Sequence, residues 1–256
     1  MNMSAISSDK DRIDSFSEVK LAHFLADGVG ESSDQMFARL ASVADADFFH
    51  LMEDNILTFR RLMTYYRCAM MEVETKFRVL DAEFKLRHDR NPIDSIQTRL
   101  KSIESLADKM IRKNYPLSME SMEKNINDIA GVRVVCAFPE DIFALADALL
   151  AQDDVRLVRR SDYVKNPKPN GYRSLHLIIE TPIFLEHEKR LMKVEVQLRT
   201  ISMNFWAALE HQLRYKKNLN PEEAEAMSAE LAHLAESAAR LDNRMQAIRN
   251  QLEGKE

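Results

Sequence analysis

The fold is decided by KNPKPNGYRSLHLIIE (Lys165–Glu180) and MKVEVQLRT (Met192–Thr200). Side chains alternate between the two faces of a β-strand, so the second stretch predicts a strand with one apolar and one polar face. The apolar face carries Val194, Val196 and Leu198, and the polar face carries Lys193, Glu195, Gln197 and Arg199. The polar face is either a solvated sheet surface or part of a functional site, and the strand pattern favours neither interpretation.

The first stretch predicts a loop that runs into a second strand. Gly171 lets the backbone turn sharply or approach a ligand closely. Lys168 and Arg173 flank Tyr172, an arrangement that can stack a purine base while its phosphates are neutralised. A lone imidazole is more often structural than functional, but this loop favours a functional role for His176, which lies at the start of the strand.

The composition is that of a globular protein. The chain has 256 residues, of which 45% are hydrophobic, enough for one large domain or a core with helical extensions. A net charge of -5 and a pI near 5.9 argue against a basic surface, so no extended nucleic-acid surface is expected. Basic residues cluster between 99 and 113 and between 156 and 173, so any polyanion site is local.

Cysteine usage and hydropathy point to a cytoplasmic protein. Cys136 lies in the apolar run GVRVVCAF and predicts a buried thiol, so the pair Cys68 and Cys136 indicates neither a disulfide framework nor a metal site. No apolar stretch has the length of a membrane span, and the N-terminal MNMSAISSDKDRID lacks the apolar segment of a signal peptide. We therefore expect no membrane partner.

Helical patterns occupy both ends of the chain. Residues 1–16 are polar and predict a disordered segment, and helices are expected around 17–27 and 34–45. Apolar residues then recur at spacings of three and four, as in a heptad seam: Phe49, Met52, Ile56, Phe59, Met63, Tyr66, Met70, Val73, Phe77, Leu80 and Phe84. A second seam follows Pro221: Met227, Leu231, Leu234, Ala238, Leu241, Met245, Ile248 and Leu252. Such seams pack inside one chain or between subunits, and the length of the first favours subunit assembly.

The middle of the chain alternates strands and helices. Strands are predicted within 96–102, 132–138 and 155–160, in addition to the two quoted above. Helices are predicted over 102–113, 140–152 and 202–217, the last with Phe205, Trp206, Leu209 and Leu213 turned inward. The expected fold class is therefore α+β, a mixed β-sheet with helices packed on it and long helices at both ends.

Basic residues surround the predicted helix at 102–113. They are Arg99, Lys101, Lys109, Arg112 and Lys113. They form either a solvated charged face or, with Ser102 or Ser105, a cradle for a triphosphate, because phosphate binding needs several convergent cations. Asp128 stands at the entrance of the strand predicted at 132–138.

Five motifs occur in sequence order within residues 91–217: TRLKSIESLADK, DIAGVRVV, DYVKNPKPNGYRSLH, VEVQLRT and MNFWAALEHQLRYK. In order and spacing they resemble the synthetase domain of RelA/SpoT-type alarmone synthetases, and the short chain is similar to the stand-alone small alarmone synthetases. The resemblance implies a nucleotidyltransferase-like core at 91–217, between a helical region at 17–90 and an oligomerisation helix at 218–256. It also implies a homotetramer that performs synthesis without hydrolysis.

The activity implied by the resemblance is transfer of the β,γ-pyrophosphate of ATP to the 3'-hydroxyl of GDP or GTP, which gives AMP and (p)ppGpp. For ATP it implies that Arg99 and Arg133 surround the adenine, and that the phosphates lie near Lys101, Ser105, Lys109 and Arg112.

The resemblance also assigns the acceptor and the metal. Tyr172 would stack on guanine, with Lys168 and His176 on phosphates and with Gln197 and Arg199 supporting the pocket. Asp128 would hold Mg²⁺, and Glu195 would complete the metal site or take the proton from the attacking 3'-hydroxyl. Two carboxylates suit a cation that keeps waters and substrate phosphates in its shell, and this transfer depends mainly on positioning and charge neutralisation.

Two departures from the family pattern leave nucleotide preference open. Thr98 stands where a glycine is frequent, and Ser161 stands where a basic residue is frequent, with Arg160 or Lys165 as possible substitutes. Three other functions remain as alternatives: a toxic relative that pyrophosphorylates adenine nucleotides or tRNA, a non-catalytic nucleotide- or RNA-binding module, and a helical scaffold. The acids and the NGYRSLH loop argue against the last two.

Overall fold

The computed structural model of the protein describes residues 56–88, 90–214 and 221–254. The segment expected to be disordered (1–16), the helices expected at 17–27 and 34–45, and the seam residues Phe49 and Met52 lie outside the described residues. The chain divides into two compact units. One contains Lys101–Ile126 and the chain up to Thr64, and the other contains Tyr65–Leu100 and Asn127–Glu256.

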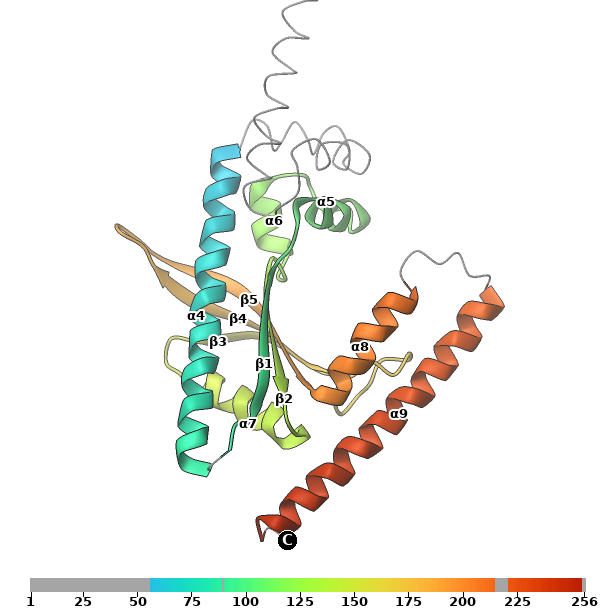
Figure 1. The fold of residues 1–256 in the computed structure, drawn as a ribbon. Coiled ribbons are helices and arrows are strands. Elements are labelled where there is room, and N and C mark those ends of the chain that lie inside the picture. The colour runs from blue at the N-terminus through green and yellow to red at the C-terminus, as the bar shows by residue number, and fades with distance from the viewer. Residues whose placement is uncertain (1–55, 89, 215–220, 255–256) are drawn as a thin grey trace, which may run out of the picture. The chain divides into compact units, whose positions relative to one another are not determined.

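The second unit is built on one five-stranded mixed sheet (Figure 1). Its strands are β1 (Ile93–Leu100), β2 (Ala130–Cys136), β3 (Arg156–Asp162), β4 (Leu175–Phe184) and β5 (Lys189–Thr200). Their order is β1-β2-β5-β4-β3, with β2 and β5 parallel and the other pairs antiparallel. The α+β class and all five expected strands are confirmed, and the two stretches quoted first form β4 and β5 at the middle of the sheet.

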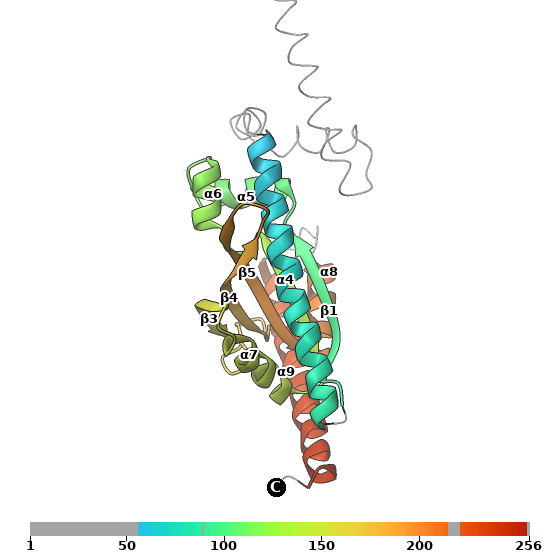
Figure 2. The same ribbon diagram turned by 90° about the vertical axis from the view of Figure 1, so that its left-hand side faces the viewer.

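Helices pack on both sides of this sheet. They are α4 (Ile56–His88), α7 (Pro139–Leu150), α8 (Ile201–Arg214) and α9 (Pro221–Leu252). The two views show the part of α4 that belongs to this unit crossing one face of the sheet, with α8 and α9 on the opposite side (Figures 1 and 2). None of the helices described here is long and apolar enough to cross a membrane.

The first unit contains two short helices, α5 (Ile103–Arg112) and α6 (Met119–Asn125). In α5 the side chain of Ser102 caps the helix by accepting a hydrogen bond from Ser105 N, and Leu106 and Met110 are buried. Helix α6 was not predicted. It is only seven residues long and carries no repeated apolar spacing, and its sequence signal is the cap at Ser118, which accepts a hydrogen bond from Ser121 N.

The apolar seam of α4 is buried within the single chain. Tyr66, Val73 and Phe77 are at most 1% exposed. Polar contacts at the edges of the helix fix it to the rest of its unit: Lys76 binds Asp154, and Asp81 accepts from the backbone of Ile93. The preference for subunit assembly through this seam is therefore wrong, and the intrachain alternative holds.

Helices α8 and α9 depart from the predicted packing. Trp206 is buried as expected, but Phe205, Leu209 and Leu213 are exposed, because α8 contacts α9 and the sheet through the narrow side that carries Met203 and Trp206. In α9 Leu231 is buried. Ala238 of the predicted seam is half-buried, whereas from Leu234 onward its large residues are more than half exposed: Leu234, Leu241, Met245, Ile248 and Leu252.

Candidate active site

The strand register brings the polar side chains of four strands to one face of the sheet. In one row Arg133 pairs with Gln97 on β1 and with Gln197 on β5, and Gln197 pairs with His176 on β4. In the next row Glu195 pairs with Gly131 and Ile178. Partners in register share a face, so the polar face predicted for β5 is continuous with polar side chains of β1, β2 and β4.

These side chains form a closed hydrogen-bonded ring. His176 joins Glu195 and Tyr172, with Nδ1 3.2 Å from Glu195 Oε1 and Nε2 2.8 Å from the Tyr172 hydroxyl. Gln197 donates to Glu195 Oε2 at 2.9 Å. Arg199 donates to the Tyr172 hydroxyl at 2.6 Å and to Gln197 Oε1 at 2.9 Å. Each member thereby fixes the orientation of the next, so the Glu195 carboxylate and the Tyr172 ring are held by one network.

Glu195 is ionised in this environment. Burial alone would raise the pKa of its carboxyl, but the hydrogen bond and charge of His176 and the hydrogen bond from Gln197 outweigh burial, so the pKa lies below its ordinary value. The negative charge of Asp128 opposes this shift, which shows that the two carboxylates interact. Asp128 lies three residues before Gly131, the register partner of Glu195.

The loop between β3 and β4 holds Tyr172 in a tight turn. Gly171 N donates to Lys168 O at 2.8 Å, and Lys168 N donates to Tyr172 O at 3.1 Å. Gly171 has a φ of +89°, a conformation that side-chain-bearing residues rarely adopt. The Lys168 ammonium lies 4.8 Å from the centroids of both the Tyr163 and Tyr172 rings. The turn thus sets an aromatic ring and a cation side by side.

Positive charge gathers beside the ring. The pKa of Arg133 is lowered by burial and then by the charges of Arg199 and Arg99. Within the described part of the chain, Arg133 Nε and Arg199 Nε are buried without a hydrogen-bond partner. Buried donors are normally satisfied, and neighbouring cations that lower the pKa of Arg133 suit an anionic ligand.

The other predicted phosphate ligands belong to the first unit. Ser105, Lys109 and Arg112 follow one another at spacings of four and three along α5, on the side away from buried Leu106 and Met110. Lys101 directly precedes the Ser102 cap, whose hydroxyl donates to Ser105 Oγ at 3.1 Å. The amphipathic α5 therefore carries a row of one hydroxyl and two cationic side chains.

The structure thus brings together most of the predicted site residues. In the second unit these are Arg99, Asp128, Arg133, Lys168, Tyr172, His176, Glu195, Gln197 and Arg199. Sequence reasoning missed Tyr163, whose ring contacts Tyr172 and His176 edge-on at 6.2 and 5.4 Å, and Asn170, which donates to Glu210 of α8. Both lie in the motif DYVKNPKPNGYRSLH, and its first tyrosine and second asparagine were the available signal.

The described residues offer a divalent cation a site made of two carboxylates. No group of three or more His, Cys, Asp or Glu side chains that would hold a metal occurs within the described ranges. The interacting pair Asp128 and Glu195 offers two carboxylates. That donor set suits Mg²⁺, which is bound through one or two carboxylates and completes its shell with waters and substrate phosphates. It does not suit a structural zinc site.

Known proteins are similar to this chain in sequence and in fold. A family model described as a region found in RelA / SpoT proteins matches residues 98–220. GTP pyrophosphokinase YwaC of Bacillus subtilis is 40% identical over 207 residues, 81% of this chain and 96% of the relative. GTP pyrophosphokinase YjbM of the same organism is 35% identical over 196 residues, 76% of this chain and 90% of the relative.

Solved structures agree. The B. subtilis small alarmone synthetase 2 is 39% identical and superposes with a TM-score of 0.67, covering 75% of this chain and 98% of that chain. The B. subtilis small alarmone synthetase 1 bound to its product pppGpp is 33% identical, with a TM-score of 0.69 and coverage of 77% and 98%. Matches of this identity over nearly the whole of each relative show that the chain belongs to the RelA/SpoT family, among its small alarmone synthetases.

Proposed function

We propose that this protein transfers the β,γ-pyrophosphate of ATP to the 3'-hydroxyl of GDP or GTP, which yields AMP and (p)ppGpp. The single observation that carries the proposal is the closed network that ties the Glu195 carboxylate to the Tyr172 ring on one face of the sheet. The network places a proton acceptor, the Glu195 carboxylate, near an aromatic ring on which a nucleobase can stack. Transfer to the ribose of a nucleotide uses both. The relatives named GTP pyrophosphokinase support the same reaction.

In the proposed reaction Glu195 acts on the acceptor hydroxyl. The 3'-oxygen attacks the β-phosphorus of ATP, the bond from that phosphorus to the α,β-bridging oxygen breaks, and AMP leaves with that oxygen. The proton of the 3'-hydroxyl passes to the Glu195 carboxylate, whose low pKa keeps it ionised and able to accept. His176 and Gln197 hold the carboxylate in place from both of its oxygens.

The acceptor is proposed to bind at Tyr172. Guanine would stack on its ring, and Lys168 and His176 would contact the acceptor phosphates. Arg199 lies 5.1 Å from the ring centroid and, with Gln197, fixes the ring through its hydroxyl. A ring held in advance loses little entropy when a base stacks on it, which favours binding.

ATP is proposed to bind through two groups of residues. The guanidinium groups of Arg99 and Arg133 would sandwich the adenine, because they stack well on π-faces. Lys101, Ser105, Lys109 and Arg112 would bind the triphosphate as a row of cations and a hydroxyl.

Mg²⁺ is proposed to be held by Asp128 together with Glu195. When bound, it would neutralise charge on the phosphate oxygens and orient the pyrophosphoryl group. The interaction between the two carboxylates supports the assignment, since a cation between two interacting like charges relieves their repulsion.

We further propose a homo-oligomer, with four subunits by family resemblance. The outward apolar seam of α9 and the exposed Phe205, Leu209 and Leu213 of α8 support it, since monomers rarely expose such stripes. The free thiols Cys68 and Cys136 support a reducing compartment, the cytoplasm.

The proposed function is tested by incubating the purified protein with Mg²⁺ and ATP labelled in its β- and γ-phosphates, together with GDP, GTP, GMP, AMP or ATP. Label is expected in a 3'-pyrophosphorylated guanosine nucleotide, with AMP formed in equal amount. Label transferred only to adenine nucleotides would identify a toxic relative instead. No transfer to any acceptor, in a protein that still binds ATP, would contradict the proposal.

A further inference from the structure

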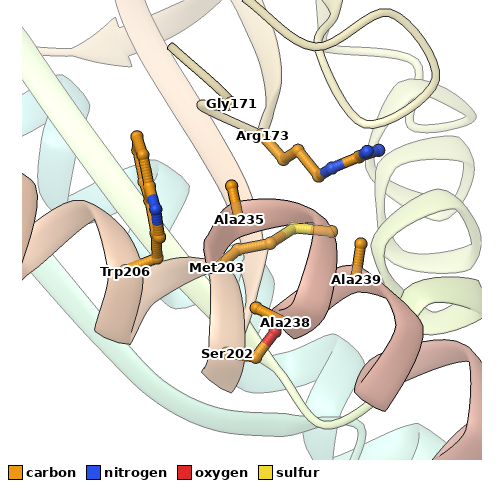
Figure 3. A pocket seen from close by; sticks show the side chains of 8 residues that line it. All are labelled: Gly171, Arg173, Ser202, Met203, Trp206, Ala235, Ala238 and Ala239. Carbon is orange, nitrogen blue, oxygen red and sulfur yellow. The ribbon is translucent and has the colours of Figure 1, made fainter. Parts of the chain in front are cut away.

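Gly171, in the turn that precedes Tyr172, lies directly against helix α9 (Figure 3). A Cβ atom placed on Gly171 would approach Ala235 Cβ to 2.5 Å and Ala232 Cα to 2.9 Å. Cβ atoms essentially never come this close to other heavy atoms, and one of the two contacts is to the helix backbone. The turn can approach α9 this closely only because glycine, at position 171, faces alanines of the helix, at positions 232 and 235.

Trp206 of α8 makes a second connection between α9 and the acceptor loop. Its indole Nε1 donates to the backbone carbonyl of Leu231 at 2.9 Å, which fixes the ring to α9. The same ring lies 6.4 Å from the Tyr172 ring, edge-on at 60°. Trp206, Leu231 and Ala235 form a buried cluster, and Tyr172 packs against it.

Two hydrogen bonds of Asn170 and close packing hold the loop at this contact. Asn170 donates to Glu210 of α8 at 3.2 Å and accepts from Tyr172 N at 3.3 Å. The cavity left between Gly171, Met203, Trp206 and Ala235 is about 10 Å³, the space of about one water molecule. A larger side chain at the contact would therefore have to displace the loop or the helix.

Helix α9 is itself fixed beyond the contact. Asp242 accepts hydrogen bonds from Thr200 Oγ1 at 2.5 Å and from Ser202 Oγ at 2.6 Å, which ties α9 to the end of β5. Further along, Arg249 lies 3.5 Å from Asp141 of α7, an acid that is 1% exposed. Since α9 is held at these points, strain at Ala235 is relieved by the loop more readily than by the helix.

We infer that α9 is a positioning element of the acceptor site, with Ala235 and Trp206 as the residues that set the height and tilt of the Tyr172 ring. This role is separate from assembly, for which α9 was expected from sequence. It rests on the proposed stacking of the acceptor guanine on Tyr172. Arg99 and Arg133, the residues proposed to hold the adenine, are not among the residues of this contact, so ATP binding is expected to change less than acceptor binding.

The test compares Ala235→Leu with Ala229→Leu, the same substitution at an exposed position of the same helix. Ala235→Leu is expected to raise the KM for GDP by about tenfold, the order of one base–aromatic stack, while the KM for ATP stays as in the wild type. Ala229→Leu is expected to leave both unchanged. Trp206 is the single tryptophan of the chain, so its fluorescence during a GDP titration reports acceptor binding whether or not transfer occurs.

A second variant guards against one that fails to fold. Gly171→Ala is expected to weaken GDP binding in the same titration, because the added Cβ would meet Ala235 and the backbone of Ala232. An unchanged GDP midpoint in Ala235→Leu or in Gly171→Ala would overturn the inference. Because binding and product formation are measured separately, this outcome would leave the proposed reaction standing.

Discussion

The proposed chemistry depends on the negative charge of Glu195, and replacement by glutamine removes that charge alone. Glu195→Gln keeps the shape of the side chain but removes the base, so transfer is expected to fall by about 10²–10⁴-fold, the usual contribution of a positioned general base. Product formation measures the loss, and thermal unfolding checks that the fold is kept. A near-wild-type rate in a folded variant would remove Glu195 from the proposed role.

The low pKa of Glu195 predicts the acid side of the pH profile. Protonated Glu195 cannot accept the hydroxyl proton, so activity is lost as pH falls through its pKa, which lies below the ordinary glutamate range. The free energy of unfolding also falls at low pH. A carboxyl whose pKa is lowered by folding stabilises the protein above its ordinary pKa, and that contribution is lost as pH falls through the folded-state pKa.

Removing His176 takes away the largest contributions that lower the pKa of Glu195. In His176→Ala that pKa is therefore expected to rise, and the acid limb of the pH–rate profile is expected to move to higher pH. Gln197→Ala removes a smaller contribution and serves as the comparison, with a smaller shift expected. If the acid limb of His176→Ala coincided with that of the wild type, the group titrating in the profile would not be Glu195.

Tyr172 has two roles that two substitutions separate. Tyr172→Ala removes the ring and is expected to weaken acceptor binding by about 1–3 kcal/mol. Tyr172→Phe keeps the ring but cuts its hydroxyl from His176 and Arg199, so it is expected to keep most of the acceptor affinity and to lower the turnover rate. Acceptor affinity and turnover are measured separately, and equal affinity losses in both variants would argue against stacking.

At the residue scale, the sequence predicted which side chains lie in the site better than it predicted the hydrogen bonds between them. Strand alternation alone placed Glu195, Gln197 and Arg199 on one face. It did not predict that His176 bridges Glu195 and Tyr172, because that contact depends on the antiparallel register of β4 and β5, which sets His176 opposite Gln197. Register is fixed by pairing between strands and cannot be read from one strand.

At the scale of elements, the burial of α4 predicts how its seam responds to truncation. Phe77→Ala empties a site that is 0% exposed and is expected to lower the free energy of unfolding by about 3–5 kcal/mol. Val79→Ala, on the face of the same helix that is 62% exposed, is expected to change it by less than about 0.5 kcal/mol. Urea unfolding measures both. A change in particle mass without loss of stability would restore the assembly interpretation of α4.

The elements themselves were largely predictable, but their faces were not. Period-two and heptad spacings located β2, β5, α4 and α9 because those patterns repeat over the whole element. In α8 the apolar residues cover a wider arc than the contact can bury. The pattern therefore predicted buried positions for Phe205, Leu209 and Leu213, but only the side that carries Trp206 is buried. Apolar spacing states which residues can be buried, and packing partners decide which are.

At the scale of the whole molecule, α9 has a buried inner face and an exposed apolar outer face. Its inner face, with Leu231 and Ala235, contacts the loop of Tyr172 through Gly171 and Trp206. Its outer face carries Leu241 and other exposed apolar side chains. A subunit bound to the outer face would therefore lie one helix diameter from the acceptor loop, which links the proposed assembly to the proposed acceptor site.

The outer face of α9 predicts where assembly fails. Leu241→Glu with Met245→Glu places two charges on a stripe where both side chains are more than half exposed, so the fold is expected to survive while burial against a second copy becomes unfavourable. Light scattering is expected to show a lower mass than the wild type. Val79→Glu, a matched apolar-to-acid change on the outer side of α4, is expected to keep the wild-type mass. An unchanged mass in the α9 double variant, in a protein that remains folded by circular dichroism, would mean that the seam does not hold subunits together.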